Sequence, residues 1–319
     1  MSYVKVIISR RCLVFALLAL VISFASCNKS PEKPAVTEAA QKTFASPEDA
    51  AKSLAEAAKA GNHDALIAIF GPGSQDVIFS GDTAQDKANF DSFTAAYATM
   101  NRWRKQTDGS EVLYLGADNN PFPIPLKKNG AGQWYFDTAA GKDEILSRRI
   151  GDNELAAMDV VAAMSAAQAE YFSQDHDGVK QYAQRFISDE AKQNGLYWKS
   201  PEGQPKSPIG PLAAYATATE GFNPEAGKQQ PFHGYFYRIL TKQGADAKGG
   251  AKDYIVNGKM TGGFAFVAYP QKYGDTGVTT FIINQNGIVY EKNLGKDTAE
   301  LAKEMTEFNP DKTWNPVPE

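Results

Sequence analysis

The chain has 319 residues, of which 43% are hydrophobic and 22% charged, a formal net charge of −4 at pH 7, and two cysteines. This composition is typical of a folded globular chain that is long enough for two domains of ordinary size. The negative charge argues against nucleic acid as a partner, because binding to phosphates requires a basic surface.

The first residues combine basic side chains with a short apolar run. Lys5, Arg10 and Arg11 precede the segment LVFALLALVISFAS, which has the length of a signal-peptide core and is too short to span a membrane. The run ends in the letters FASC, which resemble the lipobox of bacterial lipoproteins, although phenylalanine stands in place of the usual leucine. The resemblance implies that residues 1–27 are a lipoprotein signal peptide and that Cys27 is acylated. The alternative is an ordinary secretory signal with a coincidental cysteine.

An acylated Cys27 would anchor the protein to a membrane of the bacterial cell envelope, on the periplasmic side. Asn28 rather than aspartate follows the cysteine, which by resemblance to lipoprotein sorting favours the outer membrane. Removal of residues 1–27 takes away three positive charges and no negative ones, so the formal net charge changes from −4 to −7. It also removes Cys12, so no free thiol is left for catalysis, zinc binding or a disulfide. Residues 28–42 are polar and contain prolines, which predicts a tether.

Residues 43–150 are predicted to form an α+β domain that begins with helices. Ser46 can cap a helix that ends at Gly61, and Asn62 can cap a second, short helix. The segment DKANFDSFTAAYATM predicts a third helix with three aromatic residues on one face: Phe90, Phe93 and Tyr97. Three strand patterns follow, EVLYLGA, FPIPLKK and WYFDT, and the turn signal NGAG joins the last two.

Helices followed by an antiparallel meander resemble the nuclear transport factor 2-like fold, a cone with a pocket between helix and sheet. Enzymes of that fold use pocket acids and a tyrosine, so the resemblance makes Asp118, Tyr135 and Asp137 candidate pocket residues. Tyr135 and Asp137 alternate along one strand and therefore point to the same face. The alternative is that these polar residues are solvated on the face of a sheet.

Residues 151–319 are predicted to form a second α+β domain. Gly151 predicts a break before a longer helix that starts near Asn153, and the buried side of this helix is predicted to carry Leu155, Met158, Val161, Met164 and Tyr171. Five strand patterns follow: GYFYRIL, DYIV, GFAFVAYP, TTFIINQ and GIVYEKN. Asn-Gly pairs in VNGKM and QNGIV favour tight hairpins. One long helix followed by a meander resembles the globular head of type IV pilins, although the membrane helix of the pilins is absent at this point.

The order of the segments SPEDAAKSLAEAAKAGN, PFPIPL, WYFDTAAGKDEILSRRIGDNELAA, FHGYFYRIL, DYIVNGKMTGGFAFVAYP and GVTTFIINQNGIVYEKNLG covers nearly the whole mature chain. This order resembles the bacterial domain-of-unknown-function family 2950, a family of uncharacterised envelope lipoproteins. The resemblance implies no activity, so no functional residue is transferred from it.

The stretch YFSQDHDGVKQYAQRF raises the question of a bound cation. With Gly178 at the sixth position of a calcium loop, Asp175 and Asp177 occupy the third and fifth positions. Gln184 stands where the bidentate glutamate is required, and Ser173 stands where the first aspartate is expected. Two carboxylates leave most of the coordination shell to water, so we predict no metal and no cofactor. A calcium site at Asp175 and Asp177 is the alternative.

Aromatic residues are concentrated in the loops and first strand of the second domain. Five of the residues there are candidates for an exposed surface that binds a protein or a glycan: Tyr197, Trp198, His233, Tyr235 and Tyr237. Alternation sends Tyr235 and Tyr237 to one face of the strand and Phe236 to the other, so one set must leave the core unless both faces are covered. The alternative is that these side chains cover the helix and a long loop.

The sequence therefore predicts a non-catalytic cell-envelope lipoprotein that contacts the membrane through its anchor and acts as an assembly, scaffold or binding factor. The alternative is a small-molecule-binding or hydrolytic protein that uses a pocket in the first domain. A polar pocket around Tyr135 and Asp137 would favour the alternative. A pocket filled by Phe90, Phe93 and Trp134 would favour the non-catalytic hypothesis.

Overall fold

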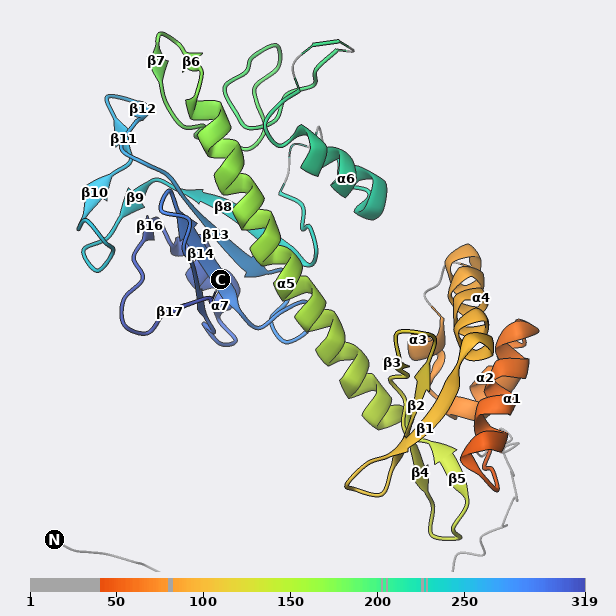
Figure 1. The fold of residues 1–319 in the computed structure, drawn as a ribbon. Helices are drawn as coiled ribbons and strands as arrows, with labels where there is room; N and C mark the ends of the chain where they lie inside the picture. Colours follow the sequence, from red (N-terminus) through yellow and green to blue (C-terminus); the bar gives the residue numbers. More distant parts are fainter. Residues whose placement is uncertain are drawn as a thin grey trace, which may run out of the picture. The chain divides into compact units, whose positions relative to one another are not determined.

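The structure is a computed structural model that describes residues 41–318, apart from residues 80–82, 202, 205, 225–226 and 228. The predicted signal peptide, with Cys27, and most of the predicted tether lie outside the described residues. Seven helices and several mostly antiparallel sheets follow one another in the described part of the chain (Figure 1). The α+β class predicted from the sequence is therefore confirmed.

The first part of the chain places four helices before a five-stranded sheet. The helices are α1 (Pro47–Lys59), α2 (His63–Phe70), α3 (Gln75–Ile78) and α4 (Thr83–Thr99). The strands are β1 (Asn101–Lys105), β2 (Glu111–Leu115), β3 (Asn120–Pro121), β4 (Leu126–Lys128) and β5 (Trp134–Phe136). The order across the sheet is β1-β2-β4-β5, with β3 paired to β2. The sequence patterns predict β2, β4 and β5 but not β1.

Helices α1, α2 and α4 pack on one face of this sheet. The predicted caps are confirmed, because Ser46 Oγ accepts a hydrogen bond from Asp49 N at 3.1 Å and Asn62 Oδ1 accepts one from Ala65 N at 3.0 Å. The core between helices and sheet contains Phe44, Leu54, Leu66, Phe70, Leu126, Trp134 and Phe136. Tyr135 alternates with its buried neighbours, so the opposite face of the sheet carries the half-buried and exposed side chains.

Helix α5 (Thr138–Phe172) continues through Gly151, so the predicted break there is wrong. A glycine inside a helix costs only about 1 kcal/mol relative to alanine, and the packing of this 35-residue helix at both ends exceeds that cost. The first turns pack against the first core, where Thr138 Oγ1 donates to Phe70 O at 2.6 Å and Gly141 lies against Ile124. The domain boundary predicted at residue 150 therefore falls inside a continuous helix.

The rest of α5 contributes an apolar stripe to a second core. Its buried residues are Ala157, Val160, Val161, Met164, Ala167, Gln168 and Tyr171. Leu155 is 61% exposed, so its predicted place on the buried side is wrong. At about 100° per residue, Leu155 projects roughly 160° away from Ala157, on the polar side of the helix. Its neighbour Glu154 instead accepts hydrogen bonds from Val278 N at 2.9 Å and Thr279 N at 3.0 Å.

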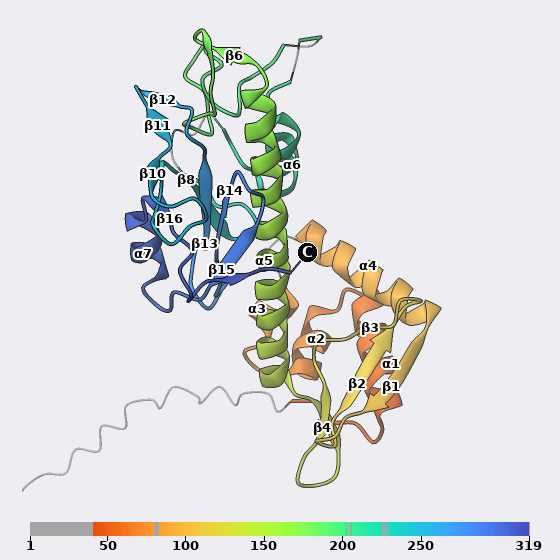
Figure 2. The ribbon, with the colours of Figure 1, turned by 60° about the vertical axis from the view of Figure 1, so that its left-hand side comes forward.

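The second core surrounds a five-stranded antiparallel sheet in the order β17-β15-β14-β13-β8. Its strands are β8 (Tyr235–Leu240), β13 (Ala265–Pro270), β14 (Thr280–Asn284), β15 (Val289–Lys292) and β17 (Asn315–Pro316). Helix α5 contacts one face and α7 (Thr298–Glu304) contacts the other (Figure 2). Every residue of β13 and β14 is buried because both faces are covered. The strand patterns for β8, β13, β14 and β15 are confirmed.

Short elements complete this part of the chain. They are β6 (Asp175–His176), β7 (Val179–Lys180), α6 (Gly210–Glu220), β9 (Lys242–Gln243), β10 (Lys252–Asp253), β11 (Ile255–Val256), β12 (Lys259–Met260) and β16 (Glu307–Phe308). Asn257 and Gly258 join β11 and β12 with φ of 54° and 78°, which confirms the first Asn-Gly hairpin. In the described part of the chain, no helix has both the length and the apolar character needed to cross a membrane.

Two glycines of α5 give a matched test of this packing. Nothing lies within 4 Å of a Cβ placed at Gly151, so Gly151→Ala should raise the melting temperature by about 2 °C through better helix propensity. A Cβ at Gly141 would lie 2.6 Å from Ile124 Cγ1, so Gly141→Ala should lower the free energy of unfolding by about 1–3 kcal/mol. Thermal melts measure the change in melting temperature, and denaturant melts measure the change in the free energy of unfolding, for both variants. Equal effects of the two substitutions would contradict the packing described here.

Candidate functional site

Asp137 has a structural role at the start of α5. Its Oδ1 accepts a hydrogen bond from Ala140 N at 3.1 Å, and its Oδ2 lies 2.9 Å from Lys127 Nζ. Burial raises the pKa of Asp137, but the hydrogen bonds from Lys127 and from the first helical turn outweigh burial and hold this pKa below its ordinary value. A carboxylate held ionised by these partners is suited to capping a helix rather than to accepting protons at neutral pH.

Neither of the other two predicted pocket residues lines the cavity found in the described part of the first domain. Tyr135 pairs with Lys127 across β4 and β5, and Asp118 is exposed in the turn after β2. A cavity of about 210 Å³ lies between the helices and the loop from Phe122 to Ile124, and its lining includes Phe90 and Phe93 but none of the three predicted residues. Apart from Asn89, the described side chains that line it are apolar.

Tyr235 and Tyr237 are core residues, which corrects the prediction that they belong to an exposed aromatic surface. They are 0% and 7% exposed, because α5 covers the face of the second sheet to which both point. Tyr235 Oη donates to Thr279 O at 2.9 Å, and Tyr237 Oη donates to Phe232 O at 3.2 Å. Burial raises the pKa of both hydroxyl groups well above the ordinary value, so they stay protonated.

His233 lies in a tight turn that leads into β8. His233 and Gly234 both have positive φ, 49° and 68°, as the two central residues of such a turn require. Glu220 is the last residue of α6, and its carboxylate accepts a hydrogen bond from His233 N at 3.0 Å. Its Oε1 also lies 3.0 Å from Nδ1 of the His233 ring. The role of His233 is therefore to attach this turn to α6.

Tyr197 and Trp198 are half-buried and pack against the second core. The backbone of Tyr197 pairs with an earlier segment: Tyr197 N donates to Phe186 O at 2.7 Å, and Ser188 N donates to Tyr197 O at 2.8 Å. These bonds position Phe186 and Ile187 as one wall of a pocket. The five predicted aromatic-surface residues are thus not brought together into one exposed surface.

Asp175 and Asp177 belong to the β6–β7 hairpin. Asp177 and Gly178 have φ of 54° and 81°, and Lys259 Nζ donates to Asp177 O at 2.7 Å. The His176 ring stacks on Tyr171 at 3.6 Å between centroids. The hairpin turn accounts for this Asp-Gly pair. Within the residues that the structure describes, no group of three or more His, Cys, Asp or Glu side chains is placed to hold a metal ion.

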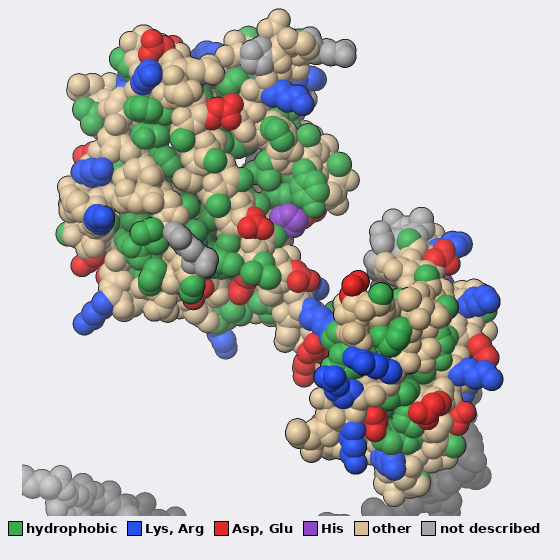
Figure 3. Space-filling model, in the orientation of Figure 1, with side chains coloured by type: hydrophobic (Ala, Val, Ile, Leu, Met, Phe, Trp, Pro, Cys, Tyr) green, Lys and Arg blue, Asp and Glu red, His purple; other side chains and the backbone are tan. Residues whose placement is uncertain are grey.

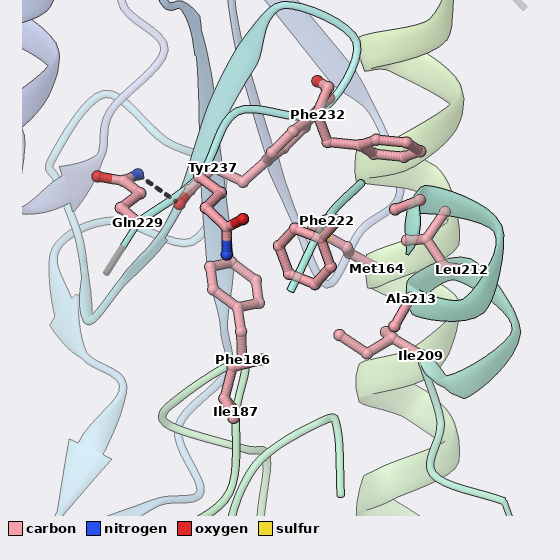
Figure 4. Close-up of a pocket in the computed structure, with 12 residues that line it drawn as sticks. Met164, Phe186, Ile187, Ile209, Leu212, Ala213, Phe222, Gln229, Phe232 and Tyr237 are labelled. Carbon is pink, nitrogen blue, oxygen red and sulfur yellow. Dashed lines mark hydrogen bonds between the residues drawn. The ribbon is translucent and has the colours of Figure 1, made fainter. Parts of the chain in front are cut away.

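An apolar pocket lies between α5, α6 and β8 (Figure 4). Its volume is about 140 Å³. The pocket is lined by Met164, Phe186, Ile187, Ile209, Leu212, Ala213, Ala216, Phe222, Gln229, Gln230, Phe232 and Tyr237. None of these twelve described residues is charged, and Figure 4 shows the apolar side chains pointing toward one another from separate segments.

Helix α6 leaves room for the pocket because two of the residues that it directs inward beside Leu212 are small. Ala213 and Ala216 lie three positions apart, on one face of the helix, and both are buried. Gly221 ends the helix with φ of 66°, a conformation that favours glycine. The chain then turns back so that Phe222 N donates to Ala216 O at 3.2 Å, and Phe222 becomes a further wall of the pocket.

The two glutamines at the pocket use their amide groups to bind the backbone. Gln229 Nε2 donates to Tyr237 O at 3.1 Å (Figure 4). Gln230 Nε2 donates to Asn223 O at 2.5 Å, and its Oε1 accepts from Asn223 N at 3.2 Å. These polar groups are therefore already engaged, and the pocket presents mainly carbon surface to a ligand.

The described lining residues present carbon surface that suits an apolar group, and none of them is charged. An apolar cavity of about 150 Å³ is large enough to hold a benzene ring. A charged group would lose its hydration there without a compensating partner among the described lining residues. The hydroxyl of Tyr237 is already bonded to the backbone. An aromatic ring or a branched aliphatic side chain is the group that fits this site.

The sequence patterns predict neither α6 nor the pocket. The segment GPLAAYATATE has mostly small side chains and no clear apolar stripe, so its periodicity does not indicate an amphipathic helix. Two signals are present nevertheless: Pro211 near the start and Gly221 just after the end. Ala213 and Ala216, three residues apart between Pro211 and Gly221, are the pattern that could have indicated a helix packed closely against another element.

The fold and site define an α+β protein with a small apolar pocket. The profile of one family, described as a protein of unknown function (DUF2950), matches residues 41–317. The chain belongs to this family, which confirms the resemblance seen in the order of its segments. No curated protein and no solved structure was found to match the chain.

The structural role of Asp137 gives a prediction with a defined pH dependence. Asp137→Ala removes the cap of α5 and should cost about 1 kcal/mol at neutral pH. Because the pKa is lowered on folding from 3.8, the carboxylate stabilises the fold above that value and loses its effect as the pH falls below it. The difference between wild type and variant should therefore shrink at acid pH in denaturant melts.

The matched control is Asp118→Ala, which should change stability by less than about 0.5 kcal/mol at either pH because Asp118 is exposed. An Asp137→Ala protein as stable as the wild type at pH 7 would contradict the capping role.

Proposed function

We propose that the protein is a non-catalytic lipoprotein of the bacterial cell envelope that acts as an assembly, scaffold or binding factor. Its N-terminal residues support this proposal through their basic start, short apolar core and Cys27. Under this proposal the acylated Cys27 holds the mature chain on the periplasmic side of a membrane, with the outer membrane favoured by Asn28.

The observation that carries the binding role is the apolar pocket between α5, α6 and β8. Residues that dominate the energy of protein interfaces are commonly large side chains that fill such pockets on the partner. A volume of about 140 Å³ and an uncharged lining match one aromatic or branched aliphatic side chain. The pocket thus serves as the receptor for an anchoring side chain of a partner protein.

A finer description of the fold is also part of the proposal. The first part resembles the nuclear transport factor 2-like fold in having helices on one face of an antiparallel sheet. The second part resembles a pilin head in having one long helix packed on an antiparallel sheet. Both likenesses are of layout alone, and the pilin-like layout of the second part is the one that supports an assembly or scaffold role.

The pocket can be tested by filling it. Ala216→Leu adds three carbon atoms to a side chain that lines the pocket, so it should prevent binding of a small apolar probe while leaving the protein folded. Wild-type protein should show a melting temperature that rises with benzene concentration, because ligand binding stabilises the folded state. Ala216→Leu should abolish that rise. The control, Ala214→Leu, lies on the exposed side of the same helix and should keep it.

The partner hypothesis requires a second readout of the same pair of variants. Photo-crosslinking from Leu212 in native membranes should give a product that Ala216→Leu removes and Ala214→Leu keeps. Benzene binding that survives Ala216→Leu, or crosslinks that are equal in the two variants, would contradict the proposed site.

Lipidation is tested independently. Cys27→Ser should move the protein from the membrane fraction to the soluble fraction and abolish labelling with a fatty-acid analogue, because the acceptor thiol is gone. Cys12→Ser is the control and should leave both unchanged. Unchanged labelling of Cys27→Ser would mean that the lipoprotein hypothesis is wrong.

A further inference from the structure

We propose that the outer face of the first sheet is a docking surface for the anionic phospholipid headgroups of a membrane. The outer face is defined here as the side of β1, β2, β4 and β5 that points away from α1, α2 and α4. Its defining residues are Arg102, Arg104, Tyr114, Lys127 and Tyr135. This inference extends the proposed function, because it names a second contact with the membrane besides the acyl anchor.

Charge is separated between the two layers of the first part of the chain. The strands β1, β2, β4 and β5 carry five basic residues and one acidic residue, a net charge of +4. The helices α1, α2, α3 and α4 carry three basic and seven acidic residues, a net charge of −4. The field of such a layered arrangement turns the sheet toward an anionic surface and the helices away from it.

Two arginines form the most accessible part of the outer face. Arg102 and Arg104 are exposed and alternate along β1, so both lie on the same side as Tyr114 of the neighbouring strand. Their guanidinium carbons lie 5.9 and 5.1 Å from the centroid of the Tyr114 ring. Within the described part of the chain, neither arginine forms an ion pair with a carboxylate, so both can bind phosphate oxygens.

The remaining cations of the sheet have a smaller part in this surface. Lys127 on the outer face is paired with Asp137 at 2.9 Å, which neutralises it locally. Lys105 at the end of β1 is exposed, but it shares the face of Trp103 and so by alternation points to the opposite side of the sheet. Figure 3 shows Lys and Arg side chains over β1 and β2, next to hydrophobic ones. A mixture of guanidinium groups and an aromatic ring suits the interface of a phospholipid membrane, where amphipathic side chains settle.

The position of the predicted anchor supports a membrane as the occupant. Phe44 pairs with Trp134 of β5, so the chain enters the fold at the edge of this same sheet. From Cys27 to Gln41 there are fourteen residue steps, which span at most about 50 Å. An acylated chain therefore keeps the sheet within that distance of the headgroups. Electrostatic attraction between the basic side chains and the headgroups acts over about 10 Å. The tether raises the effective concentration of the sheet near the membrane, so that the sheet often comes within this range.

Because the mature chain is negatively charged overall, its binding to an anionic membrane should depend on this surface alone. The mature chain has a formal net charge of −7, so it should be repelled as a whole by an anionic membrane. Binding must then depend on a local cluster of cations, and removal of a few charges from that cluster should abolish it. Each basic side chain near an anionic surface changes the partition coefficient about fivefold, so the two arginines together account for about 25-fold.

The test uses residues 28–319, the mature chain without its acylated cysteine, because an acyl anchor would hold the protein on any vesicle. Sedimentation is measured with vesicles of phosphatidylcholine alone and with vesicles containing about one-third phosphatidylglycerol. We expect binding only to the anionic vesicles, a loss of about 25-fold in Arg102→Gln with Arg104→Gln, and near wild-type binding when both arginines are replaced by lysine. Unchanged melting curves establish that the variants are folded.

The control variant, Lys248→Gln with Lys296→Gln, removes the same charge from exposed sites in the second part of the chain and should bind like the wild type. The proposal is overturned if the control loses as much binding as the arginine variant, if both vesicle types bind equally, or if neither binds. Binding to dextran sulfate without binding to vesicles also overturns it and assigns the face to an anionic glycan. None of these results depends on Cys27, so the lipoprotein proposal stands or fails by its own experiment.

Discussion

The burial of β13 and β14 on both faces is the constraint on which the second part of the structure depends. Their eleven residues are all buried, so each face of the sheet needs a covering layer. Helix α5 provides one and α7 the other. Because α5 covers its face, Tyr235 and Tyr237 of β8 become core residues rather than parts of an exposed aromatic surface. The apolar pocket is the space left beside α6, where Ala213 and Ala216 rather than larger side chains face this layer.

The first sheet shows the opposite solution, because helices cover only one of its faces. Alternation along each strand then separates core residues such as Trp134 and Phe136 from polar ones such as Arg102 and Arg104. The exposed face is therefore free to carry charge without a cost in buried ions. The second sheet is thus buried on both faces, whereas the first sheet exposes one face that carries charged side chains.

The sequence predicts the features that depend on local chemistry. The caps at Ser46 and Asn62, the Asn-Gly turn at Asn257 and the apolar strands of the second sheet all follow from side-chain and backbone preferences. It misses β1 because NRWRK contains a single apolar side chain, and its strand conformation comes from pairing with β2. Leu155 is misplaced because it lies roughly 160° around the helix from Ala157, outside the stripe that the buried residues define.

The turn from Phe232 to Tyr235 has a consequence for strand register. It fixes which residues of β8 face α5 and which face α7, where Arg238 Nη1 donates to Lys303 O at 2.8 Å. A shift of one residue would exchange the two faces and direct the Arg238 guanidinium into the apolar core against α5. That misaligned sheet would bury an unpaired charge, so it is strongly disfavoured. Glu220 accepts a hydrogen bond from His233 N and so helps to hold the turn that sets this register.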